Sequence, residues 1–241
     1  MTVSAPAARG SSAPTAAAIN AALKKSPPRK RGSNDDSPLI GVLLSLCALL
    51  APALACAGGG PLGIDHRWNY DNSGIWKRSN QDLLRYGALA ADIGLALGEG
   101  DGSRLGRSAW QAVDSVVLAG VAAEAAKRVF GRERPGDTND PNQWFKSGNR
   151  SFPSGEVAEI SSIVTPYVLE YRHDHPAVWA LELLPAYDAV ARMKVQAHWQ
   201  TDVLAGFALG TAAGIWAHER KMPLIVSVLP HGFAVGLKKQ F

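Results

Sequence analysis

The stretch His198–Gly214, HWQTDVLAGFALGTAAG, carries no charge after its fifth residue and repeats glycine at every fourth position toward its end. Residues four apart lie on one face of a helix. Gly206, Gly210 and Gly214 would therefore form a ridge of small residues, against which another helix could pack closely. We predict a helix over 199–218 that has a tightly packed neighbour.

Other helical patterns precede this one and are separated by glycine, proline and short polar residues. We predict helices over 81–97, 108–130, 156–172 and 177–193. The segment 131–155 is rich in turn-forming residues and is predicted to be a long loop. Together these patterns indicate an all-α protein whose helical domain covers 81–220.

The ends of the chain differ from this helical part. Residues 1–37 are rich in Ala, Ser, Pro and basic residues and are predicted to be disordered. Residues 38–60 are uncharged and end near ALACA, the layout of a signal peptide or a retained membrane anchor. We therefore expect an exported protein of the periplasm or cell envelope. Residues 61–80 form a polar, aromatic lead-in. Residues 221–241 have apolar side chains at alternating positions, a pattern that predicts a short β-hairpin.

The composition limits the possible functions. The chain has 241 residues, 46% of them hydrophobic, and a formal net charge of +4. The positive charge forms no basic face with interleaved aromatic residues, so we expect no nucleic acid partner. Most predicted helices contain charged residues, and the mean hydropathy is −0.04. We therefore favour a soluble or membrane-surface bundle over an integral membrane bundle.

Two segments could bind an anion. Lys127 and Arg134 lie in KRVFGRERP, at the end of a predicted helix, where basic residues often only complement the helix dipole. Ser154 and Gly155 lie in SFPSGE, where the next helix should begin. Free N–H groups at a helix start bind anions, although a serine there often serves only as an N-cap.

A third segment, ARMKVQAHWQTD, contains a possible nucleophile. His198 and Asp202 are four residues apart, so on a helix they would share a face. The carboxylate could then hold one imidazole nitrogen and leave the other free to act as a nucleophile or base. Arg192 lies six residues earlier. The alternative is a purely structural hydrogen-bonded pair.

Taken in order, Lys-x6-Arg-Pro, Pro-Ser-Gly and Arg-x5-His-x3-Asp resemble the three motifs of the type-2 phosphatidic acid phosphatase and vanadium haloperoxidase superfamily. The resemblance covers roughly 85–220. It implies a helical bundle in which the three motifs surround one phosphate group.

The resemblance also implies a role for each matched residue. His198 would attack phosphorus and form a phosphohistidine, while Asp202 would fix the tautomer of its ring. No metal or other cofactor is implied for the phosphatase reaction. Five residues would bind the phosphate: Lys127, Arg134, Ser154, Gly155 and Arg192.

Glu156 departs from the family pattern, which has histidine at this position. In the family, that histidine protonates the leaving oxygen. A carboxylic acid could do the same if burial raised its pKa, but nearby cations act against this. Glu156 could instead be a base for the water that hydrolyses the phosphohistidine. It could also be a first-turn acid in an enzyme whose leaving groups, such as phosphate, need no proton. A second departure is Ala191, where the family usually has serine.

The resemblance implies a phosphoester substrate, and lipid phosphates are the expected class. A nonspecific soluble acid phosphatase is the nearest alternative, and vanadate-dependent halide oxidation is a more distant one. From another class, the protein could be a non-catalytic binder of phosphate or lipid headgroups, an alternative that rests on Glu156.

Overall fold

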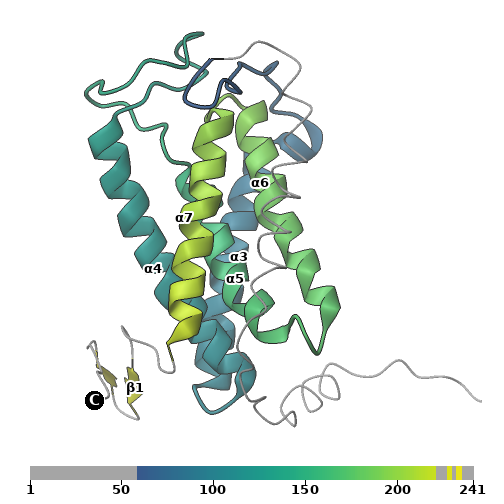
Figure 1. Ribbon diagram of the computed structural model, residues 1–241. Helices are drawn as coiled ribbons and strands as arrows, with labels where there is room; N and C mark the ends of the chain where they lie inside the picture. Colours follow the sequence, from purple (N-terminus) through teal and green to yellow (C-terminus); the bar gives the residue numbers. More distant parts are fainter. Residues whose placement is uncertain (1–58, 221–226, 230–231, 235–241) are drawn as a thin grey trace, which may run out of the picture. The chain divides into compact units, whose positions relative to one another are not determined.

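The computed structural model describes residues 59–220, 227–229 and 232–234, so the predictions for 1–37 and for nearly all of 38–60 lie outside the described residues. The long helices lie side by side in a bundle (Figure 1), which confirms the all-α prediction. The helical elements are η2 (Gly74–Trp76), α3 (Arg78–Glu99), α4 (Arg104–Phe130), α5 (Gly155–Tyr171), η3 (Pro176–Glu182), α6 (Leu183–Lys194) and α7 (Gln200–Glu219).

The segment predicted as one helix over 177–193 is divided into η3, a 3-10 helix, and α6. Two prolines account for the division. Pro176 opens η3, and Pro185 lies in the first turn of α6. Proline has no N–H to donate and is tolerated best in the first turn of an α-helix. The α-helix can therefore begin at Leu183 but not several residues earlier.

The glycine ridge of α7 packs against α5, as predicted. A Cβ atom built on Gly206 would lie 2.3 Å from the carbonyl oxygen of Ser154, and one on Gly210 would lie 2.1 Å from that of Ala158. No side chain fits at such distances. The ridge therefore brings the start of α7 against the start of α5, where two of the three motifs lie.

Helix α5 is central because it is apolar on most of its faces. Val157 contacts a core cluster with Met193 of α6 and Phe207 of α7. Ala158 packs in a second cluster with Ala119 of α4 and Ala213 of α7. Since its neighbours cover α5 on several sides, the first turn of α5 is held firmly in place.

The outer faces of α3 and α4 carry exposed apolar side chains. On α3, Leu83, Tyr86 and Leu97 follow one stripe at helical spacing, and on α4 Val121 and Val129 are exposed. Among the helices of the described residues, none combines the length and the hydrophobicity needed to cross a membrane.

Near the C-terminus, β1 (Ser227–Leu229) and β2 (Gly232–Ala234) pair antiparallel, with Val228 opposite Phe233. Residues 230–231, which would form the turn between them, lie outside the described residues. The hairpin over 221–241 therefore stays a prediction.

Candidate functional site

The three motifs meet at one end of the bundle. Here α4 and α6 end, α5 and α7 begin, and the loop between α4 and α5 lies beside the lead-in segment (Figure 1). Gly131 ends α4 in a left-handed conformation with φ of 44°. A Cβ there would lie 2.5 Å from the carbonyl oxygen of Lys146, so the sharp turn into the loop requires glycine.

His198 lies just before α7 rather than on it, because α7 begins at Gln200. The side chain is buried, and its Nδ1 lies 2.8 Å from the carbonyl oxygen of Ser151. A carbonyl oxygen only accepts hydrogen bonds, so the neutral ring carries its proton on Nδ1 and its lone pair on Nε2. No described residue forms a hydrogen bond with Nε2. His198 therefore has the tautomer that a nucleophile needs.

The surroundings also keep the ring of His198 neutral. Burial lowers its pKa to about 4, and the positive charges of Lys127 and Arg134 act in the same direction. Asp202 opposes this shift but does not reverse it. The imidazole therefore remains uncharged, with its lone pair available, throughout the neutral range.

The expected hydrogen bond between His198 and Asp202 is absent, which corrects the prediction that they share a helical face. The nearest oxygen of Asp202 lies 3.8 Å from Nδ1, too far for a hydrogen bond. The carboxylate instead accepts bonds from the backbone N–H of Trp199 at 2.9 Å and the hydroxyl of Ser151 at 2.6 Å. It therefore fixes the two segments on either side of the imidazole, and the carbonyl of Ser151 orients the ring.

A buried ionic network continues behind Asp202. The guanidinium group of Arg132 bonds to Asp202 at 2.6 Å and to Asp65 at 2.6 Å, and all three side chains are inaccessible to solvent. Thr201 donates its N–H and its hydroxyl to Asp65 at 2.8 and 2.7 Å. The lead-in is thus an integral part of the site's support, attached through Asp65 to the start of α7.

Asp65 and Arg132 were missed by the sequence interpretation. Arg132 stands two residues before Arg134 in KRVFGRERP, and nothing in that spacing indicates which arginine points inward. Asp65 is an isolated acid in a segment without periodicity. The one general guide is that a buried arginine usually pairs with a carboxylate, and this guide does not identify which carboxylate pairs with Arg132.

A cavity of about 180 Å³ lies in front of His198. Most of the residues that line it come from the predicted motifs or from α3, and three of them are glutamates. The lining residues are Arg85, Gly120, Ala123, Glu124, Lys127, Arg134, Gly155, Glu156, Glu159, Arg192 and His198. The structure therefore brings six predicted site residues to one cavity, Glu156 among them.

Lys127 reaches from the last turn of α4 to the first turn of α5. Its Nζ donates to the carbonyl oxygens of Pro153 and Arg150, and it lies 3.6 Å from the position that a Cβ on Gly155 would occupy. Burial lowers the pKa of Lys127 to about 8, and the charge of Arg134 adds to the shift. Within the part of the chain that the structure describes, the ammonium group therefore has carbonyl oxygens but no carboxylate as direct partners.

The two predicted arginines differ in how firmly they are held. Arg192 is 5% exposed; its Nη1 donates to Gln81 at 3.1 Å, and its buried Nε has no partner among the described residues. Arg134 is exposed, and the described residues offer its side chain no hydrogen bond or ion pair. Both have donors available for an anion in the cavity.

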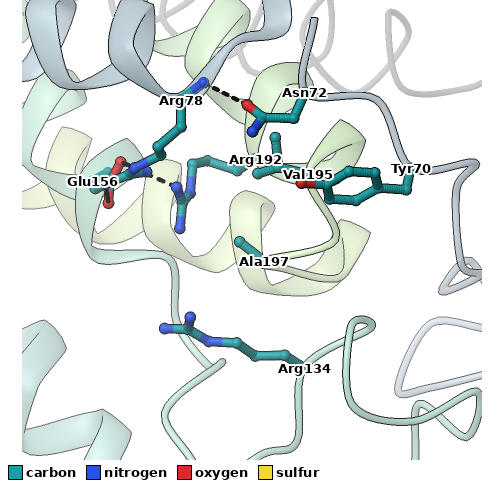
Figure 2. Close-up of a pocket in the computed structure, with 8 residues that line it drawn as sticks. All are labelled: Tyr70, Asn72, Arg78, Arg134, Glu156, Arg192, Val195 and Ala197. Atoms are coloured by element: carbon teal, nitrogen blue, oxygen red, sulfur yellow. Dashed lines mark hydrogen bonds and ion pairs between the residues drawn. The ribbon is translucent and has the colours of Figure 1, made fainter.

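Glu156 is held by arginines (Figure 2). Its two oxygens accept bonds from the two terminal nitrogens of Arg78 at 2.7 and 2.8 Å. Arg192 lies 3.5 Å and Arg85 4.0 Å from the carboxylate. This bidentate geometry suits an ionised carboxylate.

Glu156 also borders a second, larger cavity. This cavity measures about 420 Å³ and shares Arg134, Glu156 and Arg192 with the first. Figure 2 shows Arg134 approaching it from the side opposite the Arg78–Glu156 pair. The two cavities are therefore neighbours, separated by the residues that they share.

Ser154 lies behind the site rather than in it. Its backbone N–H donates to the carbonyl oxygen of Asp202 at 2.9 Å, and its hydroxyl oxygen is covered and has no partner among the described residues. Neither Ser154 nor Asp202 lines the cavities. In this conformation the free donors at the start of α5 are the N–H groups of the residues that follow Ser154.

Known proteins resemble part of this chain. A family profile for the PAP2 superfamily matches residues 108–222. Lipid A 1-phosphatases from Rhizobium johnstonii, Porphyromonas gingivalis and Rhizobium etli are 29%, 31% and 30% identical over 102 residues. These alignments cover 40%, 41% and 40% of this chain and 41%, 20% and 43% of the relatives, so the chain spans less than half the length of each relative.

One solved structure is also similar. The crystal structure of LpxE from Aquifex aeolicus matches with a TM-score of 0.46 and 20% identity, covering 73% of this chain and 94% of that one.

Proposed function

The chain belongs to the PAP2 superfamily, and from this premise we propose that it is a phosphatase that hydrolyses phosphate mono- or diphosphate esters through a phosphohistidine on His198. The observation that carries the proposal is the position of the His198 ring. Its Nδ1 is bound to a carbonyl and its Nε2 has no partner among the described residues, while Lys127 and Arg134 line the same cavity.

In the first step, the substrate's phosphoryl group occupies the smaller cavity and Nε2 of His198 attacks phosphorus in line with the leaving oxygen. Lys127, Arg134 and Arg192 stabilise the charge on the equatorial oxygens. The N–H groups at the start of α5, that of Gly155 first, add hydrogen bonds. Attack gives the ring a positive charge, which Asp202 stabilises from 3.8 Å.

Ser154 and Glu156 take supporting roles in this proposal. Ser154 fixes the start of α5 through its backbone N–H, although rotation of its hydroxyl would be needed before it could bind phosphate. Glu156 positions Arg78 and Arg192 rather than transferring a proton, because both of its oxygens accept bonds from Arg78. Of the three roles open for Glu156, this geometry favours the first-turn acid.

Lipid phosphates are the proposed substrate class. Three relatives are described as lipid A 1-phosphatases, which supports a phosphorylated lipid as the substrate here. The exposed apolar side chains of α3 and α4, including Leu83 and Val121, support association with a membrane surface. We place the enzyme in the cell envelope, after export.

Turnover of p-nitrophenyl phosphate tests the proposal. We expect hydrolysis that vanadate inhibits and that His198→Ala abolishes. His173→Ala is the matched control, because His173 lies exposed just after α5 and away from both cavities, and it should retain full activity. A non-catalytic binder of phosphate would instead show no turnover in any variant, and such a result would overturn the proposal.

A further inference from the structure

The groups around the smaller cavity leave one candidate for a proton donor. Protonation of the leaving oxygen needs a group that carries a dissociable proton near neutral pH, and arginine does not lose its proton in proteins. The titratable groups lining the cavity, apart from arginine, are Glu124, Lys127, Glu156, Glu159 and His198. His198 is assigned to the attack on phosphorus.

Each of the three carboxylates is paired with a guanidinium group. Glu156 accepts both of its bonds from Arg78. Glu159 accepts two bonds from Arg85, at 2.5 and 2.8 Å. Glu124 bonds to Arg150 and Arg128, and the bond to Arg150 is the main reason that its pKa lies below the ordinary value. The oxygens of these carboxylates are therefore already engaged by guanidinium donors, an arrangement that does not suit proton transfer to a substrate.

Lys127 is the remaining group and is well placed. An ammonium group has three protons. Two of them bond to the carbonyl oxygens of Pro153 and Arg150, so one is left for the cavity beside Gly155. Lys127 has no carboxylate partner among the described residues, whereas Arg85, the other basic residue of α3 and α4 that lines this cavity, is paired with Glu159.

We propose that Lys127 is a catalytic acid and base in addition to binding phosphate, an inference that rests on the proposed phosphatase activity. As Nε2 of His198 bonds to phosphorus, the bond from phosphorus to the leaving oxygen breaks and a proton of Lys127 Nζ moves to that oxygen. The alcohol departs and the amine is neutral. Water then attacks phosphorus and gives a proton to Lys127, while the bond between Nε2 and phosphorus breaks and His198 returns to its neutral form.

The charges around Lys127 agree with this role. Burial and then the positive charge of Arg134 lower its pKa to about 8, Arg150 lowers it further, and Asp202 and Glu124 act in the opposite direction. The other charged or titratable groups that line the cavity are Arg85 from α3, Glu156 and Glu159 from α5, Arg192 from α6 and His198. A donor whose pKa lies near the working pH transfers its proton most effectively.

A comparison of two leaving groups tests the inference on the full chain. p-Nitrophenolate leaves without a proton, whereas the alkoxide of hexyl phosphate needs one. Lys127→Arg keeps the positive charge but cannot release a proton. We expect its kcat to fall at least about 100-fold on hexyl phosphate but less than about tenfold on p-nitrophenyl phosphate.

Two further variants complete the test. Lys127→Met should show the same difference between substrates, with lower rates on both because the charge is lost, and it covers the case in which arginine does not fit. Glu156→Gln should lower both rates by the same factor. Circular dichroism and thermal unfolding verify that each variant is folded.

Three results would overturn the role of Lys127 while leaving the phosphatase proposal intact. The first is an equal fall in kcat on both substrates in the Lys127 variants. The second is a fall in kcat on hexyl phosphate alone in Glu156→Gln. The third is a wild-type enzyme that hydrolyses p-nitrophenyl phosphate but not hexyl phosphate. Hydrolysis of neither substrate by the wild type would instead refute the proposed function itself.

Discussion

Replacing Asp65 by asparagine should destabilise the whole bundle, although Asp65 lies outside the three motifs. Its carboxylate accepts bonds from Arg132 at 2.6 Å and from the N–H and hydroxyl of Thr201 at 2.8 and 2.7 Å. All of these groups are buried. Asparagine has nearly the same shape as aspartate, so the substitution leaves the packing almost unchanged. It removes the negative charge and replaces one acceptor oxygen with an NH2 group that faces other donors.

The magnitude follows from the burial of the ion pair. Removing one partner from a buried salt bridge costs about 3–5 kcal/mol, because the remaining charge is left uncompensated. Arg132 keeps Asp202 and the carbonyl of Pro141, so we expect the lower end of this range. At an m-value of about 2 kcal/mol per M, a loss of about 3 kcal/mol lowers the urea midpoint by about 1.5 M.

Urea unfolding followed by circular dichroism measures this change, and Asp71→Asn is the matched control. Asp71 belongs to the same segment, but among the described residues its carboxylate accepts bonds only from Ser73, at the surface. The control should unfold at the wild-type midpoint. If Asp65→Asn behaved like the control, the buried network would not contribute to stability as the structure implies.

Two other predictions concern packing and pH. Gly210→Ala should lower the melting temperature, because the new Cβ would lie 2.1 Å from the carbonyl oxygen of Ala158. Gly87→Ala is the control and should maintain or raise the melting temperature, because no atom lies within 4 Å of its new Cβ. Similar melting temperatures for the two variants would contradict the close approach of α5 and α7. On the acid side, the pH profile of kcat/KM, corrected for ionisation of the substrate, should fall only below about pH 4, where His198 gains its proton, and on the basic side it should fall above about pH 8, where Lys127 loses the proton that it donates; an acid-side fall near the ordinary pKa of histidine would show that burial does not keep the ring neutral.

Much of the fold could be predicted from the sequence because its signals are local. The glycine ridge from Gly206 to Gly214 identified both a helix and its close packing, and the structure confirms both. The break before Leu183 was missed, because a 3-10 helix and an α-helix have similar apolar patterns over so few residues.

The candidate site was only partly predictable, because its contacts link segments far apart in the chain. The three motifs supply six of the residues that line the cavity, including three of its four basic residues. The bond from His198 to the carbonyl of Ser151 was not foreseen, since any residue has a backbone carbonyl and the sequence does not mark it. The pairing of Glu156 with Arg78, 78 residues earlier, likewise has no signature in the spacing.

The most direct test of the proposed mechanism is to trap the phosphorylated enzyme. The wild type would be mixed with p-nitrophenyl phosphate, quenched in alkali and digested, and the position of the phosphoryl group would be determined by mass spectrometry and phosphorus NMR. Because Nδ1 of His198 is bound to the carbonyl of Ser151 at 2.8 Å, we predict phosphorylation on Nε2 of His198. A phosphoryl group on Nδ1 or on any other residue would contradict this mechanism.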